Sequence, residues 1–158
     1  MSKVLNIFKQ NVRIIFFLGL VIWTSGIFIP CFRINSPELY FLSDQFYSTV
    51  CHQSQIKSIP CNNDFLFVCS RCLGIYIGAI VLSALLLFYK KKYFQLKLLP
   101  LIISIIPVFL DVMFVKISIY DYSHTISFIT GLLFGSIVFV YILSVIENSF
   151  VENVKGKE

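Results

Sequence analysis

Four long apolar runs dominate this chain of 158 residues. Each run holds 17 to 22 residues, the length that an α-helix rising ~1.5 Å per residue needs to cross ~30 Å of hydrocarbon. The composition agrees, with 58% hydrophobic and 13% charged residues, where a soluble domain has roughly 45–50% and about 25%. We therefore expect an all-α polytopic membrane protein, a single domain over residues 1–158 that folds as a four-helix bundle. Its predicted spans are about 14–32, 72–88, 98–115 and 125–146.

Basic residues gather at one side of the predicted bundle. Nine of the thirteen Lys and Arg residues precede the first span, follow the fourth, or lie in the link between the second and third. Because positively charged loops stay in the cytoplasm, we expect a multi-pass protein of the cell membrane with both termini cytoplasmic and residues 33–71 outside. The same asymmetry accounts for the formal net charge of +5, so membrane lipid, and no nucleic acid, is the expected partner. The nine are Lys3, Lys9, Arg13, Lys90, Lys91, Lys92, Lys97, Lys155 and Lys157.

The outer segment contains one helical pattern. Leu39, Leu42, Phe46 and Val50 recur at spacings of three, four and four residues, which indicates one apolar face of a helix. We expect a short extracytoplasmic amphipathic helix around 37–50 that lies on the membrane surface or packs across the mouth of the bundle.

The cysteines suggest a metal site on the same side. Cys69 and Cys72 form a C-x-x-C motif at the start of the second span, and Cys51 is followed directly by His52. Two ligands from a C-x-x-C and one or two from a distant pair are typical of a tetrahedral zinc site. We therefore predict zinc at Cys51, His52, Cys69 and Cys72, with copper or iron as other metals that thiolate and imidazole accept. A c-type haem is excluded, because Leu73 follows the motif.

Two further ionisable residues are expected near this mouth. Asp111 lies ~20 Å along the third span from its cytoplasmic start, and His124 opens the fourth span. A charge within a span costs at least ~2.5 kcal/mol, so Asp111 should face the bundle and have a partner. Each is a candidate general base for a metal-bound water; otherwise Asp111 is an ion-pair partner of Arg71 or Lys116, and His124 an interfacial residue without a function.

Two other functions remain open. In a membrane thiol–disulfide oxidoreductase, Cys69 and Cys72 would exchange with a second pair, Cys51 and Cys61. The layout is similar to that of the quinone-linked disulfide-forming enzymes of bacterial membranes. The third hypothesis is a non-enzymatic scaffold or transport subunit with structural disulfides. Whether the protein is an enzyme is therefore left open.

Glycine pairs mark faces for close helix packing. Gly74 and Gly78 lie in the second span, and Gly131 and Gly135 in the fourth. The G-x-x-x-G spacing lets two helix backbones approach closely. The partner is another helix of the same chain or, in a homo-oligomer, a second copy.

Several of these motifs occur together in one known family. The segments 51–53 (C-H-Q), 69–78 (C-S-R-C-L-G-I-Y-I-G), 110–111 (L-D) and 130–135 (T-G-L-L-F-G) resemble an uncharacterised family of small predicted membrane proteins, domain of unknown function 2085. The resemblance covers about residues 45–140. It implies a membrane protein in which these motifs form one unit, and it brings no established activity.

Overall fold

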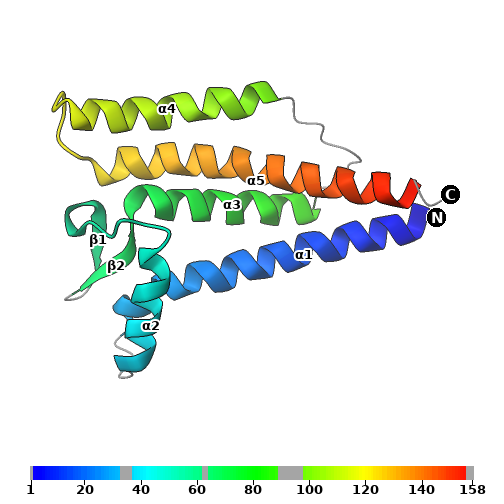
Figure 1. Cartoon of the computed structure of the whole chain (residues 1–158), viewed down its shortest axis with the longest axis horizontal. Coiled ribbons are helices and arrows are strands. Elements are labelled where there is room, and N and C mark those ends of the chain that lie inside the picture. The colour runs from blue at the N-terminus through cyan, green and yellow to red at the C-terminus, as the bar shows by residue number, and fades with distance from the viewer. Residues whose placement is uncertain (1, 33–36, 62–63, 89–97, 156–158) are drawn as a thin grey trace.

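Four long helices form the main part of the protein. The computed structural model (Figure 1) describes residues 2–32, 37–61, 64–88 and 98–155. Each predicted span overlaps one helix, although the first helix ends at Ile27 and not at 32 as predicted, and the prediction of an all-α membrane protein is confirmed. The helices are α1 (Ser2–Ile27), α3 (Ser70–Phe88), α4 (Leu98–Lys116) and α5 (His124–Lys155).

Three of these helices are long and apolar enough to cross a membrane. They are α3, α4 and the segment His124–Ile146 of α5. In the described part of the chain α1 has a shorter apolar segment, Asn11–Ile27. Arg33 and the lysines at 90–97, on which the predicted orientation depends, lie outside the described residues.

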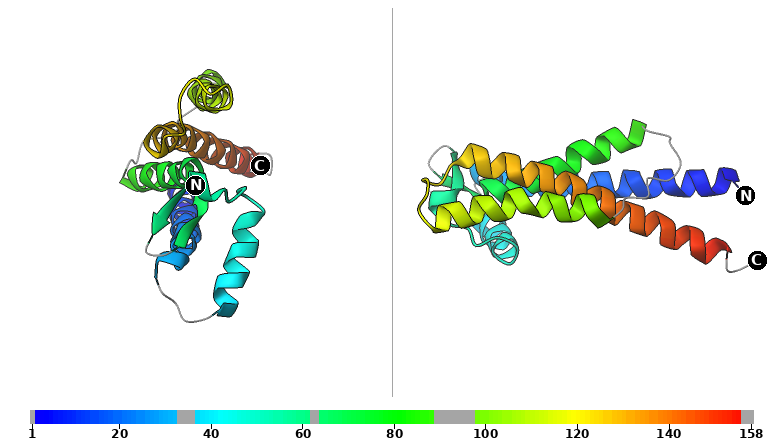
Figure 2. Two further views of the ribbon diagram at one scale, coloured as in Figure 1. Left: turned by 90° about the vertical axis from the view of Figure 1, so that its left-hand side faces the viewer. Right: turned by 90° about the horizontal axis from the view of Figure 1, so that it is seen from above.

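The helices lie side by side in the order α4, α5, α3, α1 (Figure 2). The most extensive contact is between α3 and α5, while α4 packs against α5 and α1 against α3. The predicted four-helix bundle is therefore an open row rather than a ring of helices around one axis. The pair α3–α5 is its centre, and α4 and α1 lie at opposite edges.

Glycines explain why α3 and α5 approach so closely. A Cβ atom added at Gly74 or Gly78 would overlap the carbonyl oxygen of Phe128 or Leu132 on α5. On the opposite helix, a Cβ at Gly135 would overlap the carbonyl oxygen of Ile75. The two backbones are in direct contact, so both predicted glycine faces are used within one chain. A homo-oligomer would have to use another surface.

The elements that connect α1 to α3 lie at one end of the row, opposite the start of α1 and the end of α5 (Figure 1). They include a two-stranded antiparallel hairpin that the sequence analysis did not predict. Its strands pair with a bulge between Ser58 and Pro60. The connecting elements are η1 (Ile29–Cys31), α2 (Pro37–Ser48), η2 (Gln55–Lys57), β1 (Ser58–Cys61) and β2 (Asp64–Cys69).

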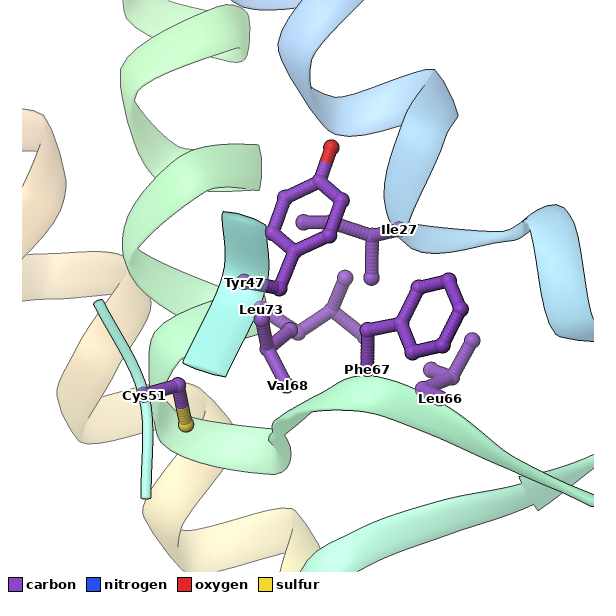
Figure 3. Close-up of a cluster of buried hydrophobic side chains, with 7 residues drawn as sticks. All are labelled: Ile27, Tyr47, Cys51, Leu66, Phe67, Val68 and Leu73. Atoms are coloured by element: carbon purple, nitrogen blue, oxygen red, sulfur yellow. The ribbon is translucent and has the colours of Figure 1, made fainter. Parts of the chain in front are cut away.

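A buried cluster joins these elements to α1 and α3 (Figure 3). The ring of Tyr47 on α2 stacks on Phe67 of β2, and its hydroxyl donates to the carbonyl oxygen of Trp23 on α1. Gly26 leaves room for this contact, because a Cβ there would overlap the tyrosine oxygen. The loop after α2 is thereby held at the start of α3. The cluster comprises Ile27, Tyr47, Cys51, Leu66, Phe67, Val68 and Leu73.

The predicted amphipathic helix is present as α2, but its apolar stripe does not pack within the described chain. Leu42 and Phe46 are each 59% exposed, and Leu39 and Val50 are also exposed. The side that packs is a neighbouring one, with Tyr47 buried. The helix runs across the direction of the four long helices (Figure 1).

Candidate metal centre

Three cysteines meet where α2, β2 and α3 come together. Cys51 follows the end of α2, Cys69 is the last residue of β2, and Cys72 lies in the first turn of α3. Their Sγ atoms all lie within 4.8 Å of one another. We call Cys51, Cys69 and Cys72 the three-cysteine cluster. It confirms the expected convergence of the C-x-x-C motif with Cys51.

Backbone N–H groups point at the sulfur of Cys51. The N–H of Cys69 donates to Cys51 Sγ at 3.3 Å, and the backbone N–H of Gln53 also favours the charged form of this sulfur. Hydrogen bonds from the Cys69 and Cys72 thiols, joined by these two N–H groups, lower the pKa of Cys51 despite its burial. Donors favour the charged form of an acceptor, so this site stabilises a thiolate.

Gln53 marks a sharp turn just after Cys51 and His52. Its φ of 43° is in the left-handed region, so the chain changes direction at this residue. The side-chain amide of Gln53 donates to the carbonyl oxygen of Asp44 at 3.2 Å, which connects this turn to α2. Reasoning from spacing missed this residue. The C-H-Q motif of the family resemblance was the only signal for it.

The spacing of the three sulfurs suits a thiophilic metal ion. An ion at the centre of a triangle with sides of 4.8 Å lies about 2.8 Å from each corner, and a zinc–sulfur bond is about 2.3 Å. Each sulfur would have to move by about half an ångström at most, which a small side-chain rotation supplies. No gross rearrangement is needed.

His52 is not part of this group. Its side chain is exposed, and its ring nitrogens are not among the ligand atoms that gather around the cluster. Of the four predicted metal ligands, the structure brings the three cysteines together and leaves His52 outside.

Asp111 faces into the row of helices, as predicted, and its partner is Arg71. The carboxylate is 4% exposed and forms an ion pair with Arg71 Nη2. The hydroxyls of Tyr120 and Ser127 also donate to it. Asp111 thus connects α4 to α3 and α5 beside the cluster, and its oxygens do not join the three sulfurs.

His124 connects α5 to the start of α3. Its Nδ1 lies 2.7 Å from the hydroxyl of Ser70, which donates to the carbonyl oxygen of Lys57 at 3.0 Å. Ser70 is fully buried. His124 therefore has a structural contact of its own and does not reach the three-cysteine cluster.

The other two cysteines form a disulfide bond between Cys31 and Cys61. It joins η1, directly after α1, to β1 of the hairpin. In the thiol–disulfide hypothesis Cys61 pairs with Cys51. This pairing is wrong, because Cys61 is bonded to Cys31. Cys51 instead lies with the C-x-x-C motif.

Relatives of the chain are uncharacterised. An uncharacterized protein of Methanocaldococcus jannaschii is 33% identical over 107 residues, 63% of this chain and 65% of that protein. Another from Methanothermobacter thermautotrophicus is 28% identical over 83 residues, 52% of this chain and 75% of that protein. The chain thus spans slightly less than two thirds of the first relative's length. No solved structure matches it significantly.

The family match covers most of the site. Residues 51–141 match the family described as predicted membrane protein DUF2085. This segment contains all three members of the cluster, the ion pair of Arg71 and Asp111, and the glycine contact of α3 with α5. Because the match extends over more than half of the sequence, the chain belongs to the DUF2085 family of predicted membrane proteins.

Proposed function

We propose that this protein binds one thiophilic metal ion, zinc in the first place, through Cys51, Cys69 and Cys72 at the outer surface of the cell membrane. The observation that carries the proposal is the convergence of three sulfurs on a site where two backbone N–H groups favour a thiolate. Thiolates are preferred ligands of zinc and also accept copper or iron.

The number of cysteines favours metal binding over disulfide chemistry. The described chain has one disulfide and three free cysteines. A disulfide within the cluster would pair two of its sulfurs and leave the third without a covalent partner. A single metal ion uses all three at once.

The charge pattern and the fold together support an outer location. The cluster and the disulfide lie at the end of the row opposite the start of α1 and the end of α5. Disulfides persist in oxidising compartments outside the cytoplasm, and Lys3, Lys9 and Lys155 at the opposite end favour the cytoplasm. In the proposed topology α1, α3, α4 and α5 all cross the membrane, and α2 lies on its outer surface.

The proposed ion would hold three separate elements in place. Cys51 comes from the loop after α2, Cys69 from β2, and Cys72 from α3. Asp111 and His124 already have partners in Arg71 and Ser70, so the proposal gives neither of them a role as general base.

Metal analysis of the protein purified in detergent tests this proposal. We expect about one zinc per chain in the wild type, as for a mononuclear site. Cys51→Ser, Cys69→Ser and Cys72→Ser should each lose the metal. The double variant Cys31→Ser/Cys61→Ser is the matched control, since it removes two cysteines outside the cluster and should retain zinc.

Two results would contradict it. One is wild-type protein that takes up no zinc, copper or iron. The other is a Cys69–Cys72 disulfide that forms reversibly in the native protein and leaves Cys51 free, which would favour the oxidoreductase instead.

A further inference from the structure

A tetrahedral metal ion needs one more ligand than the three-cysteine cluster supplies. Structural zinc sites close the shell with a fourth protein ligand, whereas open sites keep three and leave the fourth position to water or substrate. The identity of the fourth donor therefore decides what kind of site this is. The following inference rests on the proposed metal binding.

The Asp, His and Cys side chains considered as a fourth ligand either have other bonding partners or lie outside the three-cysteine cluster. Asp111 accepts from Arg71, Tyr120 and Ser127. His124 contacts Ser70, and Cys31 and Cys61 form a disulfide. His52 is exposed and outside the group. In the part of the chain that the structure describes, no fourth His, Cys, Asp or Glu joins the three sulfurs.

The three cysteines of the cluster differ in burial. Cys51 is buried against the apolar cluster that contains Val68 and Leu73. Cys69 and Cys72 both keep part of their surface exposed. Both also pack against the same apolar cluster, but their partial exposure lets a ligand from outside approach at the C-x-x-C motif.

Charge selects the kind of ligand. Three thiolates and a divalent ion carry a net charge of minus one. The nearby guanidinium of Arg71 does not offset this charge, because Asp111 already neutralises it. An anion in the fourth position would add a second negative charge in a half-buried site, where charges are poorly screened. A neutral donor adds none.

We infer that the metal at the three-cysteine cluster keeps its fourth position for a neutral oxygen or nitrogen donor from outside the chain, such as water or an imidazole. The site is thus of the open kind, able to bind a small molecule or a side chain of another protein through the metal. The ligand replaces bound water without oxidation or reduction.

Cobalt(II) substitution tests this inference in the full-length protein in detergent. Tetrahedral cobalt with three thiolates gives visible bands that change when the fourth ligand changes. We expect imidazole to shift these bands in a saturable way and azide, an anion, to bind at least about tenfold more weakly, one factor of ten being 1.4 kcal/mol.

Two variants exclude a fourth donor from the chain. His52→Ala removes the neighbouring imidazole, and Tyr76→Phe removes the phenol one turn after Cys72, which packs against the apolar cluster that contains Cys51. Both should leave the cobalt spectrum and the imidazole titration unchanged. An altered spectrum in either variant would overturn the inference while leaving metal binding intact, as would azide binding as tightly as imidazole. Absence of the cobalt–thiolate bands would instead contradict the proposed metal site itself.

Discussion

The three residues of the C-H-Q motif have different positions and different roles in the structure. Cys51 supplies a buried sulfur, His52 is exposed, and Gln53 adopts a positive φ at the turn that follows them. The motif therefore acts through its backbone as much as through its side chains. The side chain that looks most like a metal ligand beside Cys51, His52, is the one the fold leaves out.

Substitutions at Gln53 should separate the effect of its backbone conformation on metal binding from the effect of its side chain. Gln53→Gly keeps the N–H and favours a positive φ, so we expect metal affinity to stay within about threefold of the wild type. Gln53→Val disfavours this conformation, because branched residues are outliers at positive φ, and should weaken binding about tenfold or more. Zinc competition with a chromophoric chelator measures both. Equal affinities of the two variants would contradict the backbone role.

The Arg71–Asp111 pair is predicted to stabilise the fold without taking part in metal binding. Asp111→Asn keeps the shape of the side chain but leaves a partly buried guanidinium without its charge partner. Breaking such a pair typically costs about 3–5 kcal/mol, so thermal unfolding in detergent should occur at clearly lower temperature while zinc content stays the same. Asp121→Asn, at an exposed position of the α4–α5 connection, is the control and should change neither. Loss of zinc from a still folded Asp111→Asn protein would show that the carboxylate belongs to the site.

At the scale of elements, the contact between α3 and α5 positions the cluster. Cys72 and Arg71 are in the first turn of α3, and the backbone of Arg71 packs against Gly131 of α5. In a membrane, close packing of backbones is a main source of helix association. The same glycine faces therefore hold the helix from which the C-x-x-C motif projects.

Alanine substitutions at glycines test this contact. Gly135→Ala forces a methyl group into the backbone of α3 at Ile75, and overpacking typically costs about 1–3 kcal/mol. We expect a lower unfolding temperature for this variant. Gly19→Ala is the matched control, because nothing lies within 4 Å of its added methyl group, and it should be neutral or slightly stabilising through helix propensity. Equal stability of both variants would contradict the packing.

The exposed stripe of α2 is predicted to rest in the outer lipid interface. Phe46 lies on this stripe, and Phe41 is turned by about 140° from it at 100° per residue; both are well exposed. In vesicles of lipids with brominated acyl chains, the bromines should therefore quench the fluorescence of the introduced tryptophan more strongly in Phe46→Trp than in Phe41→Trp. Equal quenching at the two positions would mean that the stripe does not face the bilayer.

For the whole molecule, hydropathy alone predicted the long helices well, because the bilayer fixes their length. It could not predict their order in space, since α4 and α1 carry no pattern that shows which neighbour they pack against. The hairpin was missed because Phe65–Val68 is too short an apolar run to distinguish from a loop next to a helix. Disulfide connectivity cannot be deduced from spacing, so the pairing of Cys31 with Cys61 needed the fold.

The three-cysteine cluster was predictable only in part. The C-x-x-C spacing and the distant cysteine indicated convergence, and the structure agrees. The structure buries Cys51 and leaves the side chain of His52 exposed. This difference cannot be predicted from two residues that are adjacent in the sequence. Asp111 was expected to face inward because a lone charge in a span needs a partner; the choice of Arg71 among its candidate partners came from the packing of α3 against α5.

X-ray absorption at the zinc edge of the zinc-loaded protein shows whether the three sulfurs of the cluster bind the metal. We predict a first shell of three sulfurs at about 2.3 Å and one oxygen or nitrogen at about 2.0–2.1 Å, with the sulfur count reduced in Cys69→Ser. A shell made only of oxygen and nitrogen, or no zinc in the purified protein, would contradict the account.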